Sequence, residues 1–282
     1  MWGNKQKQKS KKIKRWFFIG TLILLVVFLS YTYERRLQNK LAVEAARAKA
    51  ALSAEKSITL IEGWNLKEIQ TYLVKRGFAD AKDLTSLKMK DYRGDYLFMA
   101  DAPANASLEG YFFPDTYRVY ASSTLDDIVK KSLDNFQSKF TADFLMEAKR
   151  QNKSVYQILT MASVLEKEVK SESDMKIVSG VFWNRIKNGQ ALQSCASLAY
   201  ILGVNKPQYS YEETRTPSAY NTYLNKGLPP GPICSPSLKA IRAALYPTQN
   251  DYNYFLSDPA TGKTIFSKTY EEHLRNKNKY LK

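Results

Sequence analysis

The sequence predicts an α+β protein with an N-terminal transmembrane helix, a small α/β module and a larger mixed α+β domain. Three observations predict this: an uncharged apolar run near the N-terminus, a strand-turn-helix pattern after it, and helical periodicities followed by a Gly- and Pro-rich segment. With 282 residues and 44% hydrophobic side chains, the chain can bury a sizeable core. The predicted tail, transmembrane helix, helical spacer, module and large domain span 1–15, 16–33, 34–56, 57–106 and 107–282.

Residues 16–33, WFFIGTLILLVVFLSYTY, are the predicted transmembrane helix. They carry no charge, and at about 1.5 Å per residue they span roughly 27 Å, close to a bilayer's hydrocarbon core. Trp16, Tyr31 and Tyr33 suit the two membrane interfaces. Seven Lys and Arg among the first fifteen residues predict a cytoplasmic N-terminus, with the rest of the chain held outside the cell (inner) membrane by a single pass. The alternative is a signal peptide cleaved in the Ala-rich stretch 42–51.

The formal net charge of +16 indicates an anionic partner. Because the predicted domains lie outside the cell, we expect cell-wall polymers and lipid headgroups and no nucleic acid. The chain has one histidine, His273, and two cysteines, Cys195 and Cys234, and none has metal-ligand spacing. The sequence therefore predicts no metal, no cofactor and no histidine-based catalytic triad.

Residues 34–56 contain no Gly or Pro and predict a helical spacer of roughly 35 Å, or a flexible stalk with the same role. The module then begins with an alternating strand at 58–60 and a turn at Glu62-Gly63. Asn65 and Glu68 form a capping-box pattern before an apolar helical stripe. This arrangement resembles half of a LysM-like sugar-binding module, although many small α/β units share it.

Residues 107–120, SLEGYFFPDTYRVY, gather aromatic side chains around Glu109, Asp115 and Arg118. Such a mixture suits sugar binding, because pyranose rings have apolar faces and hydroxyl edges. The alternative is an ordinary buried strand and turn. Residues 124–150 then predict a helix capped by Thr124.

The helix that follows Ser154, SVYQILTMASVLEKEVK, holds the predicted acid. With Val155 at zero, Glu166 falls at about 20°, inside the apolar stripe, whereas Glu168 falls at about −140° and is expected in solvent. Burial favours a protonated carboxyl group, which a general acid for glycosidic cleavage requires. The alternative is a structural ion pair of Glu166 with a buried cation such as Arg185.

The segment 203–236 is rich in Gly and Pro and too long for a simple connection, so it is a candidate binding loop. It contains consecutive aromatic, amide and hydroxyl groups at Tyr220, Asn221, Thr222 and Tyr223. Upstream, Asn184 and Arg185 are polar groups among predicted core residues.

Seven blocks in order resemble the endolytic murein transglycosylase family (MltG/YceG-like): LEGYFFPDTY, ASVLEKEV, VFWNR, LQS, YNTY, GLPPGPICSPS and FSKTYEEH. The family's architecture is similar, with one N-terminal anchor, a LysM-like module and a catalytic domain. Its catalytic glutamate is the first of the EKE motif, which maps onto Glu166. The matched blocks imply a substrate-binding groove lined by Glu109, Tyr117, Asn184, Gln193, Tyr220, Asn221, Thr222 and Tyr223.

The resemblance implies a membrane-anchored lytic transglycosylase that cleaves the MurNAc–GlcNAc β-1,4 bond within peptidoglycan strands, leaves 1,6-anhydro-MurNAc ends and terminates nascent strands. One carboxyl group suffices, because the MurNAc 6-hydroxyl is an internal nucleophile. The implied partners are glycan strands, the membrane and peptidoglycan synthases. A non-catalytic peptidoglycan-binding protein or a cell-wall-synthesis scaffold is the alternative.

Three positions depart from the family pattern. Cys195-Ala196 stands where many members have Asp-Pro, Thr264 replaces an expected histidine, and Leu274 replaces an asparagine after His273. Because the exterior space is oxidising, we predict a disulfide between Cys195 and Cys234, with two unpaired thiols as the alternative.

Overall fold

The computed structural model describes residues 2–206 and 208–281, and the side chains of 2–24, 51 and 52 lie outside the described part. The chain divides into two compact units. Unit 1 comprises Met1–Glu55 with Tyr120–Ser122, and unit 2 comprises Lys56–Val119 with Ser123–Lys282. Helices and two small sheets confirm the predicted mixed α+β class.

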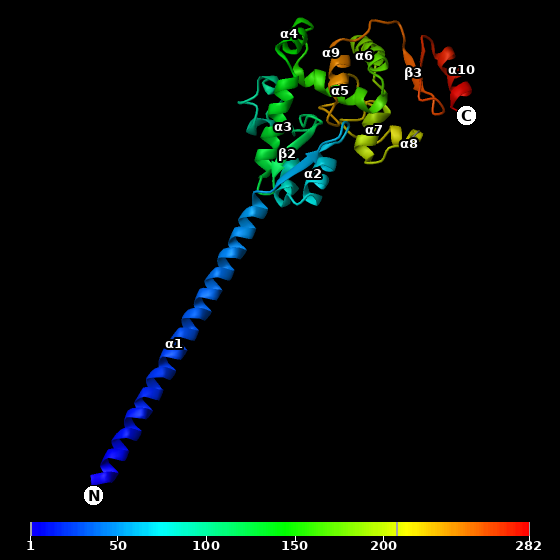
Figure 1. Cartoon of the computed structure of the whole chain (residues 1–282). Helices are drawn as coiled ribbons and strands as arrows, with labels where there is room; N and C mark the ends of the chain where they lie inside the picture. The colour runs from blue at the N-terminus through cyan, green and yellow to red at the C-terminus, as the bar shows by residue number, and fades with distance from the viewer. Residues whose placement is uncertain (1, 207, 282) are drawn as a thin grey trace. The chain divides into compact units, whose positions relative to one another are not determined.

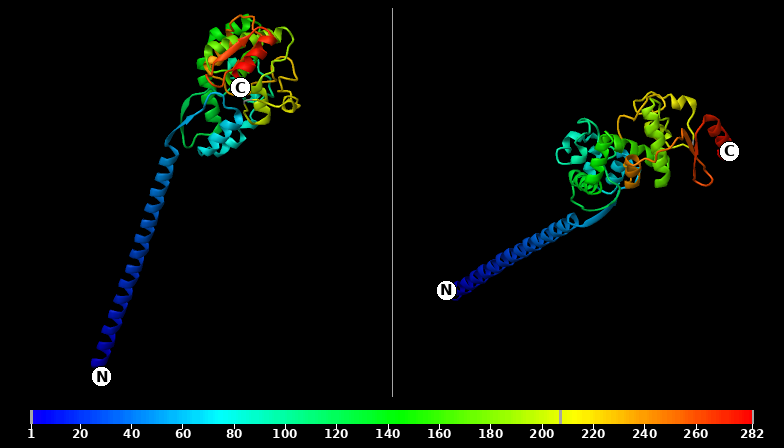
Figure 2. Two further views of the ribbon diagram at one scale, coloured as in Figure 1. Left: turned by 90° about the vertical axis from the view of Figure 1, so that its right-hand side faces the viewer. Right: turned by 90° about the horizontal axis from the view of Figure 1, so that it is seen from above.

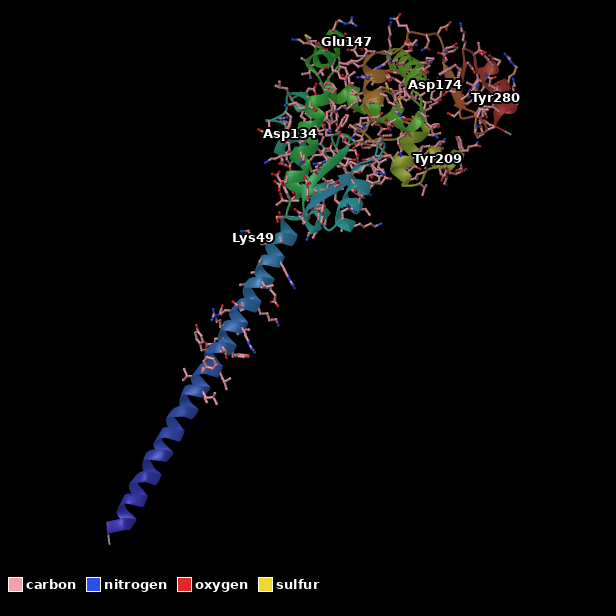
Figure 3. The ribbon with its side chains drawn as sticks, viewed as in Figure 1. Lys49, Asp134, Glu147, Asp174, Tyr209 and Tyr280 are labelled. Carbon is pink, nitrogen blue, oxygen red and sulfur yellow. The ribbon has the colours of Figure 1, made fainter. Side chains whose placement is uncertain are left out.

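Unit 1 consists mainly of one helix, α1 (Trp2–Leu52; Figure 1), on which Lys49 is labelled in Figure 3. The predicted spacer is therefore helical as far as Leu52. Among the described residues, no helix combines the length and the apolar character needed to cross a membrane. The predicted transmembrane segment 16–33 lies partly outside the residues whose side chains are described.

Strand β1 (Glu55–Thr59) pairs with β2 (Thr116–Tyr120) in a two-stranded sheet, and all but Glu55 and Tyr120 of these strands belong to unit 2. Helix α2 (Leu66–Lys75) begins with the predicted capping box, in which Asn65 and Glu68 bond each other's backbone amides. Three short 3-10 helices follow at Ala79–Ser86, Met89–Asp91 and Leu97–Met99.

The predicted helix over 124–150 is two helices, α3 (Leu125–Lys139) and α4 (Ala142–Arg150). Phe140 leaves helical geometry, with φ −89° and ψ 78°, and its side chain is buried. Its ring lies edge-on to that of Phe144, with centroids 5.5 Å apart. The break thus places an aromatic ring in the core.

Helix α5 (Val155–Glu168) lies at the centre of unit 2 and packs against α9 (Leu238–Leu245), which also packs against α6 (Glu172–Lys187). Helices α7 (Cys195–Leu202) and α8 (Tyr211–Thr214) follow α6 (Figure 1). The other described residues of the Gly- and Pro-rich segment, 203–206, 208–210 and 215–236, are irregular.

An antiparallel hairpin of β3 (Tyr254–Ser257) and β4 (Thr264–Ser267) packs against α10 (Tyr270–Tyr280) at the C-terminal end of unit 2 (Figure 2). The register pairs Phe255 with Phe266. Thr264, which replaces the histidine expected by resemblance, donates its hydroxyl to Asp174 on α6 at 2.9 Å (Asp174 is labelled in Figure 3).

The predicted module and the predicted large domain share one hydrophobic core within unit 2. For example, Phe98 of the module region stacks on Phe136 of α3, with ring centroids 4.7 Å apart. The division at residue 106 and the likeness to LysM remain predictions.

Candidate active site

Glu166 lies in the last turn of α5, which Ser154 caps as predicted. The apolar face of α5 is buried, and Glu166 is half-buried at its C-terminal end. Its Oε2 accepts hydrogen bonds from the backbone N–H of Ser237, at 2.9 Å, and from the Ser237 hydroxyl. The alternative ion pair with Arg185 is not formed, since Arg185 donates to the carbonyls of Leu192 and Asn253.

Ser237 is the N-cap of α9, and its Oγ accepts a hydrogen bond from the Ala240 N–H at 3.3 Å. Since that oxygen is already an acceptor, its own proton is free to point at Glu166. The positive end of the helix dipole also lies here. One oxygen of Glu166 is therefore held by two hydrogen-bond donors at the start of a helix.

A turn from the module region forms the second side of the site. Gly63 has φ +79°, and a Cβ there would lie 3.8 Å from Cγ of Glu166 and 3.4 Å from Cδ of Lys167. Lys167 donates to the Gly63 carbonyl at 3.2 Å. Gly63 and Trp64 each bond the backbone of Ser235, at 2.8 Å. The turn and the Pro-rich segment therefore hold each other in place beside Glu166.

The Gly- and Pro-rich segment is also held by contacts with α5 and with Gly110. The Ile233 N–H bonds the Ser163 hydroxyl of α5 at 3.0 Å. Gly110, at φ +82°, lies so close to Pro232 that a Cβ would be 2.4 Å from that ring. Only glycine fits there, because the backbone is left-handed and the space is occupied.

Two cavities are lined by Lys167, the residue after Glu166, whereas Glu166 itself lines neither. The smaller, of about 110 Å³, has Gly63, Asn65, Lys167 and Tyr200 among its lining residues. The larger, of about 510 Å³, includes Lys167, Glu168, Cys195, Asn205, Lys206 and Ser257. Lys167, Ala196, Ala199 and Asn205 line both, so the two cavities are neighbours.

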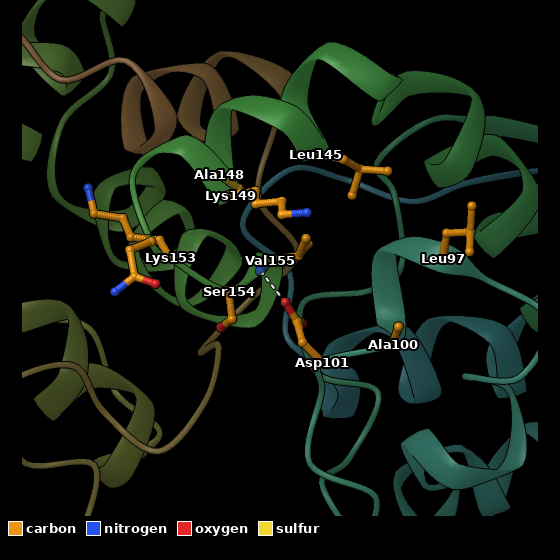
Figure 4. Close-up of a pocket in the computed structure, with 10 residues that line it drawn as sticks. Leu97, Ala100, Asp101, Leu145, Ala148, Lys149, Lys153, Ser154 and Val155 are labelled. Atoms are coloured by element: carbon orange, nitrogen blue, oxygen red, sulfur yellow. Dashed lines mark hydrogen bonds between the residues drawn. The ribbon is translucent and has the colours of Figure 1, made fainter.

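A third cavity, of about 390 Å³, lies at the other end of α5 (Figure 4). Asp101 and Val155 line it, and the Val155 N–H bonds Asp101 at 2.7 Å. Its position at the N-terminus of α5 separates it from Glu166.

The expectation that Glu168 is in solvent is wrong. The side chain is only partly exposed, and Ser194 Oγ and the Ala196 N–H, the latter at 3.2 Å, both bond its Oε1. Burial raises the pKa of Glu168, opposed by these bonds and by nearby Arg185. The physical reason is α7, which covers the side of α5 that faces away from the apolar stripe.

Glu109 is deeply buried, at 5% exposure, and caps a helix. Its two oxygens accept from the Leu66 N–H at the start of α2, at 3.1 and 3.2 Å, and Tyr200 donates to it at 3.4 Å. Desolvation raises the pKa of Glu109 to about 7, although these hydrogen bonds lower it. Glu109 is thus a buried, titratable group near the site, and its hydrogen-bond partners lie in the protein interior.

Three tyrosines cluster near Glu109. Tyr200 and Tyr220 have ring centroids 5.1 Å apart, and Tyr156 donates to the Pro230 carbonyl at 3.0 Å. A Cβ on Gly231 would lie 2.3 Å from the Tyr156 oxygen and 3.3 Å from that of Tyr220. Tyr220 therefore packs in one cluster with Tyr156 and Tyr200, two tyrosines that the sequence motifs did not single out, and its role in binding stays a prediction.

Other predicted binding residues have internal partners. Asn221 is fully buried and donates to the Thr214 and Thr216 carbonyls, while buried Thr222 bonds Ser194 and Ser197. These two side chains organise the loop rather than face a groove.

The remaining four predicted residues are dispersed. Exposed Asn184 donates to the Asn250 carbonyl, and exposed Gln193, at φ +52°, bonds the Thr222 carbonyl through its N–H. Tyr117 is buried and donates to the Phe113 carbonyl at 2.6 Å, with Ser132 and Asn135 as its other partners. Tyr223 lies beside the larger cavity through its contact with Cys195.

The predicted disulfide is wrong, because Cys195 and Cys234 are both free. Exposed Cys195 contacts the Tyr223 hydroxyl at 3.2 Å, whereas buried Cys234 contacts the Ser163 carbonyl at 3.3 Å. The two thiols thus have separate partners on different sides of the last turns of α5. Over the part of the chain that the structure describes, no group of three or more His, Cys, Asp or Glu residues is placed to hold a metal ion.

Sequence motifs could have indicated two missed residues. Ser237 precedes the periodic run LKAIRAAL, which is a helix N-cap pattern. Gly63 follows an acidic residue in a predicted turn. Their closeness to Glu166, however, depends on tertiary contacts.

Known proteins resemble this chain over 62% of its length. It is 38% identical over 175 residues to the endolytic murein transglycosylase of Bacillus subtilis (strain 168), an alignment that covers 62% of this chain and 48% of that protein. It is 36% identical over 181 residues to the endolytic murein transglycosylase of Streptococcus pneumoniae serotype 2 (strain D39 / NCTC 7466), covering 62% of this chain and 33% of that protein. The chain thus matches half or less of the length of these relatives.

A solved structure gives the same relationship. The crystal structure of a yceG-like protein from Listeria monocytogenes superposes with a TM-score of 0.67 and 32% identity, covering 78% of this chain and 75% of that one. The YceG-like family matches residues 30–279. The family inferred from the motifs is therefore confirmed: this protein belongs to the YceG-like family.

Proposed function

We propose that this chain is an endolytic peptidoglycan lytic transglycosylase, with Glu166 as its single catalytic acid/base. The relatives named endolytic murein transglycosylase support the reaction. The observation that carries the assignment to Glu166 is its setting, a half-buried carboxyl group beside the turn at Gly63, with one oxygen held by Ser237. No described residue hydrogen-bonds Oε1, which is the oxygen we assign to proton transfer.

The proposed reaction uses these groups in two stages. Protonated Glu166 donates from Oε1 to the glycosidic oxygen between MurNAc and GlcNAc, and the C–O bond breaks as an oxocarbenium-like state forms. The Ser237 N–H and hydroxyl stabilise the carboxylate that results. Oε1 then takes the proton of the MurNAc 6-hydroxyl, whose oxygen bonds to the anomeric carbon and closes the 1,6-anhydro ring.

Several finer parts of the proposal rest on the sequence. Residues 16–33 would anchor the protein in the cell membrane by a single pass, with the N-terminus in the cytoplasm and the catalytic part outside. The module at 57–106 would bind glycan as a LysM-like unit, and peptidoglycan synthases would be partners in ending nascent strands. Of the residues proposed to line the groove, Tyr220 and Glu109 both contact Tyr200.

Mass spectrometry of glycan strands incubated with the full chain tests the proposal. We expect fragments ending in 1,6-anhydro-MurNAc, released from within strands. Reducing ends would instead indicate a hydrolase. Intact strands that bind the protein would indicate a peptidoglycan-binding protein or a cell-wall-synthesis scaffold.

A further inference from the structure

We propose that Lys167 and the larger cavity beside it form a subsite for a carboxylate that the substrate carries next to the cleaved bond. The inference rests on the proposed function for the nature of the substrate. Lys167 follows Glu166 in the chain and lines both cavities, and its ammonium group lies beside Gly63, which lines the smaller one.

The ammonium group has capacity for a ligand. Lys167 is exposed and donates to one neutral group, the Gly63 carbonyl, at 3.2 Å. A lysine has three N–H donors, so two remain. Among the described residues, no carboxylate lies within salt-bridge distance of Lys167. An exposed ammonium at a concave surface is suited to an anionic group.

The larger cavity supplies space and a second cation. Its volume of about 510 Å³ is within the usual range for small-ligand sites. Lys206 also lines it and is held by a salt bridge to Glu213. Asn205 and Ser257 add neutral polar groups. Glu168 on the same wall is already bonded through Oε1 to Ser194 and Ala196, and burial favours its neutral form.

In peptidoglycan, the carboxylates belong to the lactyl group of MurNAc or to the peptide attached through it, whereas GlcNAc has none. Recognition of a carboxylate here would identify the MurNAc unit and so fix which glycosidic bond meets Glu166. The lactyl group and the peptide both supply a carboxylate, and the three glycan probes described next distinguish between them.

The test measures binding of the full chain carrying Glu166→Gln to soluble glycan strands. Three probes are needed: strands with stem peptides, the same strands with carboxylates converted to methylamides, and strands from which an amidase has removed the peptides to leave free lactyl carboxylates. We expect methylamidation to weaken binding about tenfold, the scale of one charge-assisted hydrogen bond. Adding Lys167→Gln should cause a similar loss on native strands and remove the effect of methylamidation.

Matched variants separate charge recognition from structure. Lys167→Arg keeps a cation and should still discriminate charged from methylamidated strands, and Lys149→Gln, an exposed lysine at the third cavity, should behave as the parent. Dependence on Lys167 with the peptide-free strands would assign the lactyl carboxylate, and dependence only with peptide-bearing strands would assign the peptide.

The proposal is overturned if Lys167→Gln discriminates between charged and methylamidated strands as well as its parent does. It is also overturned if the variant loses affinity equally for both while its unfolding temperature drops, since that indicates only a role in holding Gly63. Failure of the wild type to produce anhydro ends would count against the proposed reaction. The binding result for Lys167 could still be interpreted, because it does not depend on cleavage.

Discussion

The two glutamates in the last turn of α5 have the same anchoring but different surroundings. Each uses one oxygen to accept from the N-terminal region of a later helix: Glu166 from Ser237 of α9, and Glu168 from Ser194 and Ala196 of α7. Glu166 faces the turn at Gly63, where two chain segments meet. Glu168 lies under α7 near Arg185, and burial raises its pKa. The anchor alone therefore does not distinguish the proposed catalytic residue, Glu166, from Glu168; the segments around each of them do.

Replacing Glu166 by Gln gives the largest expected effect. The variant keeps the side-chain volume and an acceptor for Ser237 but has no proton to transfer, so cleavage should fall by about a thousandfold, within the usual range for general acid-base catalysis. Quantified anhydro-muropeptide release would measure this, with circular dichroism as the control for folding. A variant that retained more than a few per cent of the wild-type rate would contradict the proposed role of Glu166 and remove its distinction from Glu168.

Glu109 is a third carboxyl group that accepts hydrogen bonds at the start of a helix, in this case α2. Its pKa is about 7 in the folded protein against 4.5 for the ordinary group, so the folded state holds an extra proton between these values. The free energy of unfolding should then fall as pH rises through this window, by ~3 kcal/mol in total.

Glu109→Gln should remove that pH dependence. Urea titrations between pH 4 and 8 should show that the unfolding free energy of the variant rises relative to that of the wild type as pH rises. Parallel curves for the two proteins would show that Glu109 ionises normally.

The serines offer a symmetric pair of variants. Ser237→Ala removes a donor to Glu166 and should lower kcat by about tenfold to a hundredfold, because a hydrogen bond to a charged group is lost. Ser194→Ala removes the corresponding donor to Glu168 and should leave kcat within about threefold. Initial rates on the same strands decide between them, and equal losses would remove the distinction between the two glutamates.

Glu168→Gln should have the smallest effect. The amide oxygen can accept from Ser194 and Ala196, and burial of a neutral group costs less than burial of a charge, which offsets the lost attraction to Arg185. We expect a change below about 1 kcal/mol in unfolding free energy and rates close to wild type. Thermal unfolding beside the rate assay tests this, and a loss of rate comparable to that of Glu166→Gln would make Glu168 a second catalytic group.

Sequence reasoning was strongest where a property depends on one helix. The capping residues Asn65, Thr124 and Ser154 agree with the sequence patterns, and Glu166, which the helical wheel puts inside the apolar stripe, is half-buried at the end of α5. Glu168 was misjudged because a helical wheel contains no information about α7. The break at Phe140 was missed because apolar residues continue at helical spacing across it.

The binding loop shows a second limit. Asn221 and Thr222 have the chemistry of sugar-binding groups, but a long irregular loop must also satisfy its own backbone. Their side chains do so inside the protein. Composition alone cannot distinguish the two roles, because both use the same donors and acceptors.

The fastening of the Pro-rich segment has a consequence for folding order. Glu166 and Ser237 are 71 positions apart, and Lys167 and Gly63 are 104 apart, so the contacts of the site close long loops. Such contacts form late, after local helices have appeared. A partly folded chain thus has α5 and its glutamate without the serine that supports it or the turn that faces it, so the proposed active site is complete only when folding is nearly complete.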